Sequence, residues 1–568
     1  MNRWLAYSRV LLKKHGLSDW MMVLSLSAFP VFLYVPNLPM WWISGDDTQI
    51  LKHAASYQSW DYFFIPSAWQ ELSQFNLTPM VTALYDFDLY LFGLNPVGFY
   101  VHHLAMFVLL SWTTYRFLTL WLSPLAGFVV SALFSLSPCY SYSVNSLMTR
   151  HYVEGLFWVL WAAIFYTNAL RKQRLSLAYW GALFYLLATL NKEIYVPFVL
   201  LLPVWPERDP CRAEQTRTEA LRKRIPYFFP FFVVTGAYCF YRRWMLAEYW
   251  IGGYGAYYSS YPDLSRIAVQ IGNRLLGDSL WLTAVVVPLG VWGIIGKDPK
   301  MCSRLGFASL LILFLSIPLI TVLPVLSERH LFLPTFILLV AAGFGLTVLW
   351  HHGFVGRVVA LSCILLLFVG YFKAYEKTQV ELGQASARYA TQGVFLWEET
   401  TDDDALFAEG LEEWYLEGLY WLRSHVDKRP QMGSAIINFC YMLYTNPFMC
   451  EWDRLWRYDP EKQSIIRVEP GVLEEMTRKC LGSYRSAVSL EMRFWQDGQY
   501  VAWELGPYET GTYFIVSPKT GNRIAIPRTS RILGRLENII RKEKQLHICY
   551  THPDGWTACS TWSPQTTR

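Results

Sequence analysis

The sequence predicts a polytopic α-helical membrane protein that carries a C-terminal α/β domain on the outer side of the membrane. The chain has 568 residues, of which 53% are hydrophobic and only 16% are charged, whereas an ordinary soluble domain is about 25% charged. The charge is uneven: 44 charged residues fall in 1–372 and 49 in the much shorter 373–568. We therefore expect a membrane domain over 1–372 and a water-soluble domain over 373–568. The net charge of +5, with no interleaved basic block, argues against nucleic-acid binding.

Eleven apolar segments approach the length of about 20 residues that a helix needs to cross a bilayer. The fifth and sixth are short and meet at Asn191-Lys192-Glu193, so the count is open by about one pair. Residues 44–96, after the first segment, form the first outer loop. The eleven segments are 20–42, 97–118, 124–141, 152–170, 176–190, 194–206, 225–244, 280–296, 305–326, 331–350 and 354–372.

The positions of Lys and Arg predict the orientation. They concentrate before the first segment and in the loop 208–224, and such loops face the cytoplasm. An odd number of spans then places 373–568 outside, in a lumen or in the periplasm at a bacterial inner membrane. The long apolar stretch after Lys14 lacks a small-residue cleavage site, so we expect the first span to be retained.

Five of the ten cysteines lie in 373–568. Cys549 and Cys559 flank the turn sequence His-Pro-Asp-Gly, and Cys440 and Cys450 flank Thr-Asn-Pro. In an oxidising compartment each pair is a candidate disulfide, with Cys480 left single; the alternative is five buried thiols.

The remaining patterns of this domain predict an α/β fold. Residues 373–426 are predicted to be helical, because apolar residues recur there at helical spacing. These residues are Leu406-Phe407, Leu411, Trp414-Tyr415 and Leu419. From Ser489 the pattern alternates, and Asp497-Gly498 and Thr520-Gly521-Asn522 supply hairpin turns. We find no metal-ligand spacing here.

Ionisable residues gather at the outer ends of five spans, where charge is costly and usually functional. They belong to separate spans but to one side of the membrane, which predicts one water-filled site. The residues are Asp46 and Asp47; Arg150, His151 and Glu154; Lys192 and Glu193; Arg242 and Arg243; and Glu328, Arg329 and His330.

Each group also has a purely structural explanation. The acidic pair is then a helix cap, Glu328-Arg329 a local ion pair, and Lys192-Glu193 a polar break between spans. The remaining arginines, Arg150 and Arg242-Arg243, then anchor helices among headgroups. Their joint occurrence on one side favours a site.

Such a site suits the transfer of a sugar from a lipid-linked donor. A carboxylate beside the bilayer can take the proton of an acceptor hydroxyl, and cations can hold the donor phosphate and stabilise it as it leaves. Soluble nucleotide sugars are confined to the cytoplasm, so a transferase working outside needs a membrane-borne donor.

Stretches along residues 40–350 resemble, in order and spacing, the GT-C superfamily of polyprenyl-phosphate-sugar-dependent glycosyltransferases. The resemblance is greatest to the tetratricopeptide-containing O-mannosyltransferases and their bacterial relatives. It departs from them at Thr78-Pro79, where Arg-Pro is usual, at His330, where tyrosine is usual, and in the absence of the repeats. The stretches are Asp46-Asp47, LFGLNPVGFYVHHL (91–104), SPCYSYSVNSLMTRHYVEGLFW (137–158), NKEIYVP (191–197), YRRWML (241–246) and SERHLFLP (327–334).

The resemblance implies transfer of one sugar from a polyprenyl-phosphate donor, with inversion, to an extracytoplasmic glycan, lipid or surface protein such as a pilin. It implies Asp46 as the general base, with Asp47 orienting the acceptor or a cation. Donor-phosphate binding is then expected from Arg329, Arg242, Arg243, Lys192, His330 and Arg150, supported by Glu154, Glu193, Glu328 and His151. The resemblance implies no particular cofactor, and it leaves open whether a divalent cation is needed.

Two other functions were weighed. A transporter or flippase of lipid-linked sugars would use similar cations, but it should show internal symmetry between halves, and the sequence shows none. A structural anchor for the outer domain would not need charges at the ends of five spans.

Overall fold

The computed structural model describes residues 17–73, 76–205, 217–246, 328–401, 403–408, 410–429, 433–446, 454–497, 500–532 and 546–562. The spans predicted at 280–296 and 305–326 lie outside these residues. The described chain divides into two compact units. The helical unit holds residues 17–40, 57–246 and 328–383, and the α/β unit holds 41–56 and 384–562.

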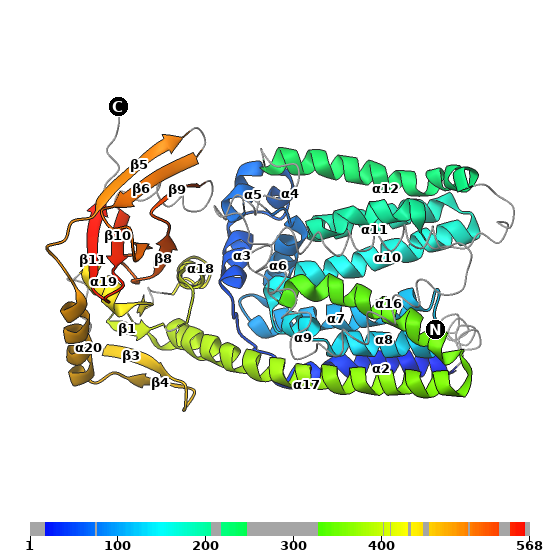
Figure 1. The fold of residues 1–568 in the computed structure, drawn as a ribbon, viewed down its shortest axis with the longest axis horizontal. Helices are drawn as coiled ribbons and strands as arrows, with labels where there is room; N and C mark the ends of the chain where they lie inside the picture. Colours follow the sequence, from blue (N-terminus) through cyan, green and yellow to red (C-terminus); the bar gives the residue numbers. More distant parts are fainter. Residues whose placement is uncertain are drawn as a thin grey trace. The chain divides into compact units, whose positions relative to one another are not determined.

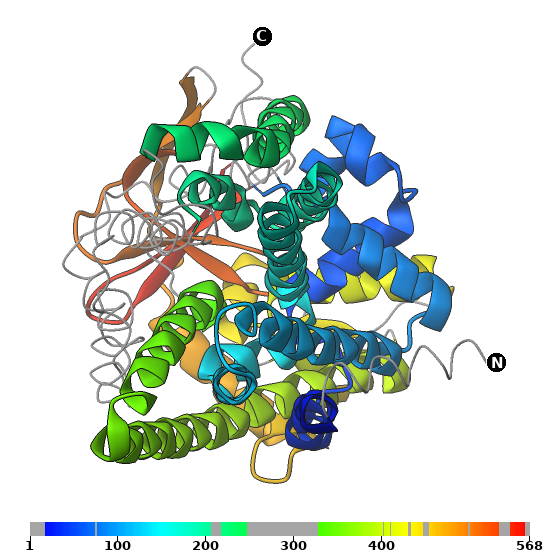
Figure 2. The ribbon, with the colours of Figure 1, turned by 90° about the vertical axis from the view of Figure 1, so that its right-hand side faces the viewer.

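The helical unit consists of helices that run largely side by side (Figures 1 and 2). They are α2 (Leu17–Tyr34), η1 (Val35–Asn37), α4 (Asp61–Phe64), α5 (Pro66–Leu72), α6 (Pro79–Phe92), α7 (Pro96–Leu118), α8 (Pro124–Leu136), α9 (Pro138–Val144), η2 (Leu147–Thr149), α10 (Arg150–Lys172), α11 (Leu175–Asn191), η3 (Glu193–Val204), α12 (Arg217–Leu246), η5 (Glu328–Leu331), α16 (Phe332–Trp350) and the first part of α17 (Gly353–Val394).

Proline marks where several of these helices begin. Pro66, Pro79, Pro96, Pro124 and Pro138 each occupy the first helical position, where the missing N–H costs nothing and the fixed φ suits the helix. Side-chain caps complete two of these ends: Asn95 accepts from the Val97 amide at 3.1 Å, and Ser123 accepts from the Ala126 amide at 3.3 Å. Local sequence therefore defines the helix starts.

Five described helices are long and apolar enough to cross a membrane, and six if α8 and α9, bent by 62°, form one broken span. They are Asp19–Asn37, Pro96–Leu118, Leu147–Lys172, Glu328–Trp350 and Gly353–Glu399. The expected eleven spans are therefore not confirmed. The predicted segments 176–190 and 194–206 are shorter helices, and the second is a 3₁₀ helix with Pro197 and Pro203 inside it, where an α-helix would lose hydrogen bonds.

Aromatic rings and small hydroxyl groups form the core of the helical unit. The ring of Tyr140 lies 4.6 Å from Phe107 and 5.4 Å from Phe134. The buried hydroxyl of Ser111 hydrogen-bonds to Tyr140 at 2.8 Å and to Ser135 at 3.1 Å. Hydroxyls that join helices in this way stabilise bundles in membranes, where the hydrophobic effect between helices is weak.

In its described residues, the α/β unit combines three small sheets with four short α-helices and the π-helical turn η6. One sheet has the order β2-β1-β3-β4, with parallel pairing of β1 to β2 and to β3; the others are antiparallel, with orders β11-β10-β7-β8 and β5-β6-β9. The elements are α3 (Gly45–Ser56), η6 (Phe395–Glu399), β1 (Asp404–Phe407), α18 (Glu413–His425), β2 (Ser434–Ile436), α19 (Phe439–Thr445), β3 (Arg454–Asp459), β4 (Ser464–Arg467), α20 (Pro470–Ser483), β5 (Glu491–Asp497), β6 (Tyr500–Gly506), β7 (Thr512–Val516), β8 (Arg523–Ile526), β9 (Thr529–Ile532), β10 (Leu546–Thr551) and β11 (Thr557–Trp562).

The hairpin predictions are confirmed and one helix prediction is wrong. β5 pairs with β6, and β7 pairs with β8 across Thr520-Gly521-Asn522, where Gly521 adopts a φ of +70° that glycine tolerates. Residues 404–407, expected to be helical, form β1, a fully buried inner strand of its sheet. A short apolar run in a buried strand lacks the alternation that would distinguish it from a helix.

The described residues of this unit contain two disulfide bonds. Cys549 and Cys559 face each other in the β10–β11 hairpin and are bonded, as predicted. Cys440 is bonded to Cys480, not to Cys450, so the expectation of a single Cys480 is wrong. The reason is tertiary packing: α19 lies against α20, which brings the two Cα atoms to 5.2 Å.

Candidate functional site

The acidic pair lies in the first turn of α3, in the α/β unit. The N-cap is Ser44, whose hydroxyl accepts from the Asp46 amide at 3.2 Å, so neither aspartate caps the helix. Asp46 is exposed, whereas Asp47 is fully buried and accepts from the Ile43 amide at 3.4 Å. The pair thus presents one solvent-facing and one enclosed carboxylate.

The other ten predicted residues all belong to the helical unit. Among them, Arg150 is fully buried at the start of α10 and forms an ion pair with Asp88 of α6. Its guanidinium also donates to the Phe99 carbonyl at 2.7 Å and lies 4.9 Å from the centre of the Tyr85 ring. This cation is held by protein groups on several sides.

Asp88 joins this arginine to a histidine. Its second carboxylate oxygen lies 2.6 Å from His102 Nδ1 on α7. Glu154, one turn along α10, is buried within electrostatic range of both Arg150 and Asp88. Its Oε2 atom has no hydrogen-bond partner among the described residues. Four ionisable side chains from three helices therefore form one buried charge cluster.

Glu193 and Arg242 form a second internal pair. Arg242 donates to the Glu193 carboxylate through Nε at 2.8 Å and through Nη2 at 3.4 Å. The Leu77 amide donates to the same carboxylate at 3.0 Å. Arg242 is buried, so a bidentate, charge-assisted contact in this place is strong. It links η3 and α12 to the segment before α6.

A group of cationic side chains surrounds Tyr152, near the start of α10. Lys192 Nζ lies 5.5 Å from the centre of that ring, and the rings of His151 and His330 lie 4.4 Å and 6.2 Å from it. Arg329 lies beside them, with Nη1 3.1 Å from the Met148 sulfur. Lys192, Arg329 and His330 are all within electrostatic range of His151. We call Lys192, Arg329, His151 and His330 the cationic cluster, whose positive charge is carried by Lys192 and Arg329.

The structure thus divides the predicted cations by environment. The cationic cluster brings α10, η3 and η5 together, while Arg150 and Arg242 are ion-paired and buried. Arg243 and Glu328 are both half-buried. Asp88, His102 and Tyr152 were not singled out from the sequence as site residues. A signal for Asp88 existed, since a carboxylate inside an apolar helical segment usually has a buried partner.

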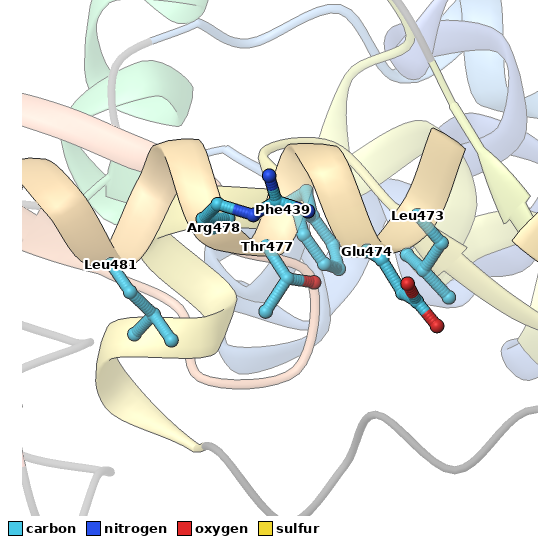
Figure 3. Close-up of a pocket in the computed structure, with 6 residues that line it drawn as sticks. All are labelled: Phe439, Leu473, Glu474, Thr477, Arg478 and Leu481. Atoms are coloured by element: carbon cyan, nitrogen blue, oxygen red, sulfur yellow. The ribbon is translucent and has the colours of Figure 1, made fainter. Parts of the chain in front are cut away.

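No group of three or more His, Cys, Asp or Glu side chains suited to a metal ion occurs within the described ranges. A separate hollow of about 510 Å³ lies on the α/β unit along α20, lined by Phe439, Leu473, Glu474, Thr477, Arg478 and Leu481 (Figure 3). It contains one acidic and one basic side chain and shares no residue with the predicted site.

The chain resembles membrane glycosyltransferases of known structure only distantly. Archaeoglobus fulgidus oligosaccharyltransferase, in complex with zinc and sulfate, is 11% identical, with a TM-score of 0.45; the match covers 89% of this chain and 72% of that one. The same enzyme in complex with an inhibitory peptide and a dolichol-phosphate is 10% identical, with a TM-score of 0.45; the match covers 91% of this chain and 74% of that one. Mycobacterial arabinofuranosyltransferase AftD is 12% identical, with a TM-score of 0.40; the match covers 91% of this chain but only 40% of that enzyme. No family model and no curated protein matches.

Proposed function

We propose that the protein is an integral-membrane glycosyltransferase of the GT-C type. It moves a single sugar from a polyprenyl-phosphate donor to an extracytoplasmic glycan, lipid or protein, with inversion at the anomeric carbon. Its N-terminus is cytoplasmic and its α/β unit lies in the periplasm of a bacterial inner membrane. The observation that carries the proposal is the cationic cluster, because positive side chains concentrated at the ends of membrane helices bind an anionic headgroup.

In this proposal the cationic cluster holds the donor phosphate and stabilises it as the sugar leaves. The ion pairs of Arg150 with Asp88 and of Arg242 with Glu193 keep α10, η3 and α12 in place around it. Arg243 is proposed as a further phosphate contact. Glu154 and Glu328 balance the charge of the cations, and Asp47 orients the acceptor or a divalent cation.

Asp46 is proposed as the general base. It is the exposed member of the acidic pair, so an acceptor hydroxyl can reach it, whereas buried Asp47 suits an orienting role. We expect Asp46→Asn to retain folding and donor binding and to lose about 100-fold or more in turnover, the scale of general-base catalysis. Sugar transfer by purified protein in detergent is the measurement, and Asp554→Asn, a change of an exposed carboxylate in the β10–β11 turn, is the control. A folded Asp46→Asn enzyme with normal turnover would exclude it as the base.

Donor binding gives the sharpest test of the phosphate site. We expect Arg329→Ala to weaken binding of a polyprenyl-phosphate sugar by roughly 10- to 150-fold, because a lost charge-assisted hydrogen bond costs about 1.5–3 kcal/mol. Arg171→Ala is the matched control, since it lies at the other end of α10, about 32 Å away at 1.5 Å per residue. Equal affinities of the two variants would contradict the phosphate role.

A transporter or flippase of lipid-linked sugars is the alternative function. It predicts that purified protein moves the donor lipid across a vesicle bilayer without cleaving the bond between sugar and phosphate. Release of the polyprenyl phosphate that depends on added acceptor supports the transferase.

A further inference from the structure

Helix α3, which carries the acidic pair, docks on helix α18 of the α/β unit. Three hydrogen bonds join them: the Gly45 amide to Glu412 at 3.0 Å, the Thr48 hydroxyl to the Tyr415 carbonyl at 3.1 Å, and the Gln49 side chain to the Trp414 carbonyl at 2.6 Å. An ion pair between Lys52 and Glu417 at 3.0 Å adds a fourth link. The contacts run along the whole length of α3.

The packing between the two helices leaves no space for extra atoms. A Cβ atom at Gly418 would lie 2.6 Å from the Thr48 hydroxyl and 2.8 Å from the Thr48 backbone carbon. A Cβ atom at Gly45 would lie 1.7 Å from the Trp414 ring. Glycine at both positions lets the backbones approach closely, so the position of α3 is defined by contact and not only by the loop that carries it.

The region around the acidic pair is also fixed from the side of α18. Trp41, just before α3, donates to the Tyr415 hydroxyl at 2.9 Å, and the ring of Tyr389 lies 5.2 Å from that of Tyr415. Burial raises the pKa of the Tyr415 phenol, and the nearby charge of Asp47 contributes to the rise. The Tyr415 side chain therefore lies within electrostatic range of the buried Asp47 carboxylate.

We infer that α18 is the positioning element of the acidic pair, with Glu412, Tyr415 and Gly418 as its positioning residues. This inference rests on the proposed function, in which Asp46 is the base. The carboxylate that takes the acceptor proton is thus aligned by the C-terminal domain, 367 residues further along the chain. Alignment of a catalytic group contributes strongly to rate, and a displacement of about 1 Å can cost roughly 100-fold.

Gly418→Ala is the test, because alanine is the better helix former and should leave α18 itself intact. The added methyl group should push α3 away from α18. We expect kcat to fall by about 100-fold, with an unchanged KM for the donor, since no proposed donor contact lies on α3. Gly383→Ala is the matched control: it also lies within a helix, and its added Cβ meets no described atom within 4 Å beyond its chain neighbours and the backbone of its own helix.

A second readout does not depend on catalysis. A zero-length carbodiimide should join Lys52 to Glu417 in the wild-type chain and in Gly383→Ala, but not in Gly418→Ala; mass spectrometry identifies the cross-linked peptide. Amide exchange over 45–56 should rise in Gly418→Ala while exchange over 413–425 stays low. Lys52→Arg, which cannot form the amide cross-link, verifies the assignment.

The outcomes separate the inference from the proposed function. Loss of the cross-link together with loss of kcat supports the positioning role. Normal turnover without the cross-link, or a preserved cross-link in Gly418→Ala, overturns it and leaves the donor site unaffected. A wild-type chain that forms the cross-link but transfers no sugar overturns the proposed function, and with it the catalytic part of this inference.

Discussion

A buried guanidinium needs a partner, and Arg150 shows how the helical unit provides one. Its charge is compensated by Asp88, by the Phe99 carbonyl and by the face of Tyr85. Removing one member of a buried ion pair is costly because the other charge is left without compensation in a poorly polarisable surrounding. The pair should therefore be essential for the stability of α6 against α10.

We expect Asp88→Asn to lower the free energy of unfolding by about 3–5 kcal/mol, measured by thermal unfolding in detergent. Asp86→Asn provides the control two residues away on the same helix, where the carboxylate is half-buried and accepts from Ser59; losing such a contact costs about 1 kcal/mol. Equal stability of the two variants would show that Arg150 does not depend on Asp88.

Asp404, at the start of β1, should make the α/β unit sensitive to acid. Burial alone would raise its pKa, but hydrogen bonds from Trp456 and Thr401, at 2.9 Å each, and the Arg454 guanidinium at 3.1 Å outweigh burial and lower the pKa. The folded-state pKa thus lies below the ordinary value of about 3.9. The resulting stabilisation is present above that value and is lost as the pH falls through the folded-state pKa.

We therefore expect the stability of the wild-type α/β unit to fall as the pH drops below about 4, and to fall less in Asp404→Asn, which has no carboxylate to protonate. Near-UV circular dichroism of the full chain, recorded against pH, follows the transition. Asp554→Asn should keep the wild-type profile; identical profiles for all three proteins would contradict the role of Asp404.

Among the elements, the two disulfides differ in the length of chain that they enclose. Cys440–Cys480 closes 40 residues and Cys549–Cys559 closes 10. In the chain-entropy model, a disulfide stabilises by restricting the unfolded chain, more so for a longer loop. The first bridge should therefore contribute about 4 kcal/mol and the second about 2.7 kcal/mol.

We expect Cys440→Ser/Cys480→Ser to destabilise the α/β unit by about 1 kcal/mol more than Cys549→Ser/Cys559→Ser. Denaturant unfolding under non-reducing conditions compares the two double variants, and Cys363→Ser, a free cysteine of α17, is the control. The reverse order of stability would show that the contribution of the disulfides depends mainly on strand pairing in the β10–β11 hairpin and not on loop closure.

The elements also show what the sequence could predict. Apolar segments of spanning length, alternating strands and hairpin turns are local signals, and they located α7, α8, β5 to β8 and the Cys549–Cys559 bridge. The partner of Cys440 and the strand β1 depend on contacts between distant segments. The sequence left the segment 194–206 open as a short span, and the structure shows a 3₁₀ helix with two internal prolines there.

At the scale of the whole molecule, the uneven charge predicted a membrane domain over 1–372 and a soluble domain over 373–568. The structure has two compact units, one of which joins residues 41–56 to 384–562. Part of the candidate site was also visible, since charge at the ends of apolar segments pointed to the cationic cluster. The buried Asp88 and its half-buried partner His102 were missed, and so was the assignment of α3 to the α/β unit. No local sequence pattern in residues 45–56 predicts that they pack against a helix near residue 415.

The orientation of the chain is the prediction that belongs to this scale. α17 has 42 residues, about 63 Å at 1.5 Å per residue, so it continues well beyond a hydrocarbon layer of about 30 Å. A reporter that is active only in the periplasm is best fused after residue 568, where it leaves α17 intact. We expect activity there and none for a reporter fused after residue 210; two inactive fusions would indicate an even number of spans, and the opposite pattern would indicate an inverted orientation.

The docking of α3 on α18 also has a consequence for biosynthesis. Thr48 leaves the ribosome 367 residues before its partner Tyr415. At about 5–20 residues per second, the acidic helix waits roughly 20–70 s for its docking surface to be synthesised. Until then the nascent chain carries these carboxylates on a segment that lacks its docking partner. In the proposed function, sugar transfer therefore begins only after the C-terminal domain has been synthesised and folded.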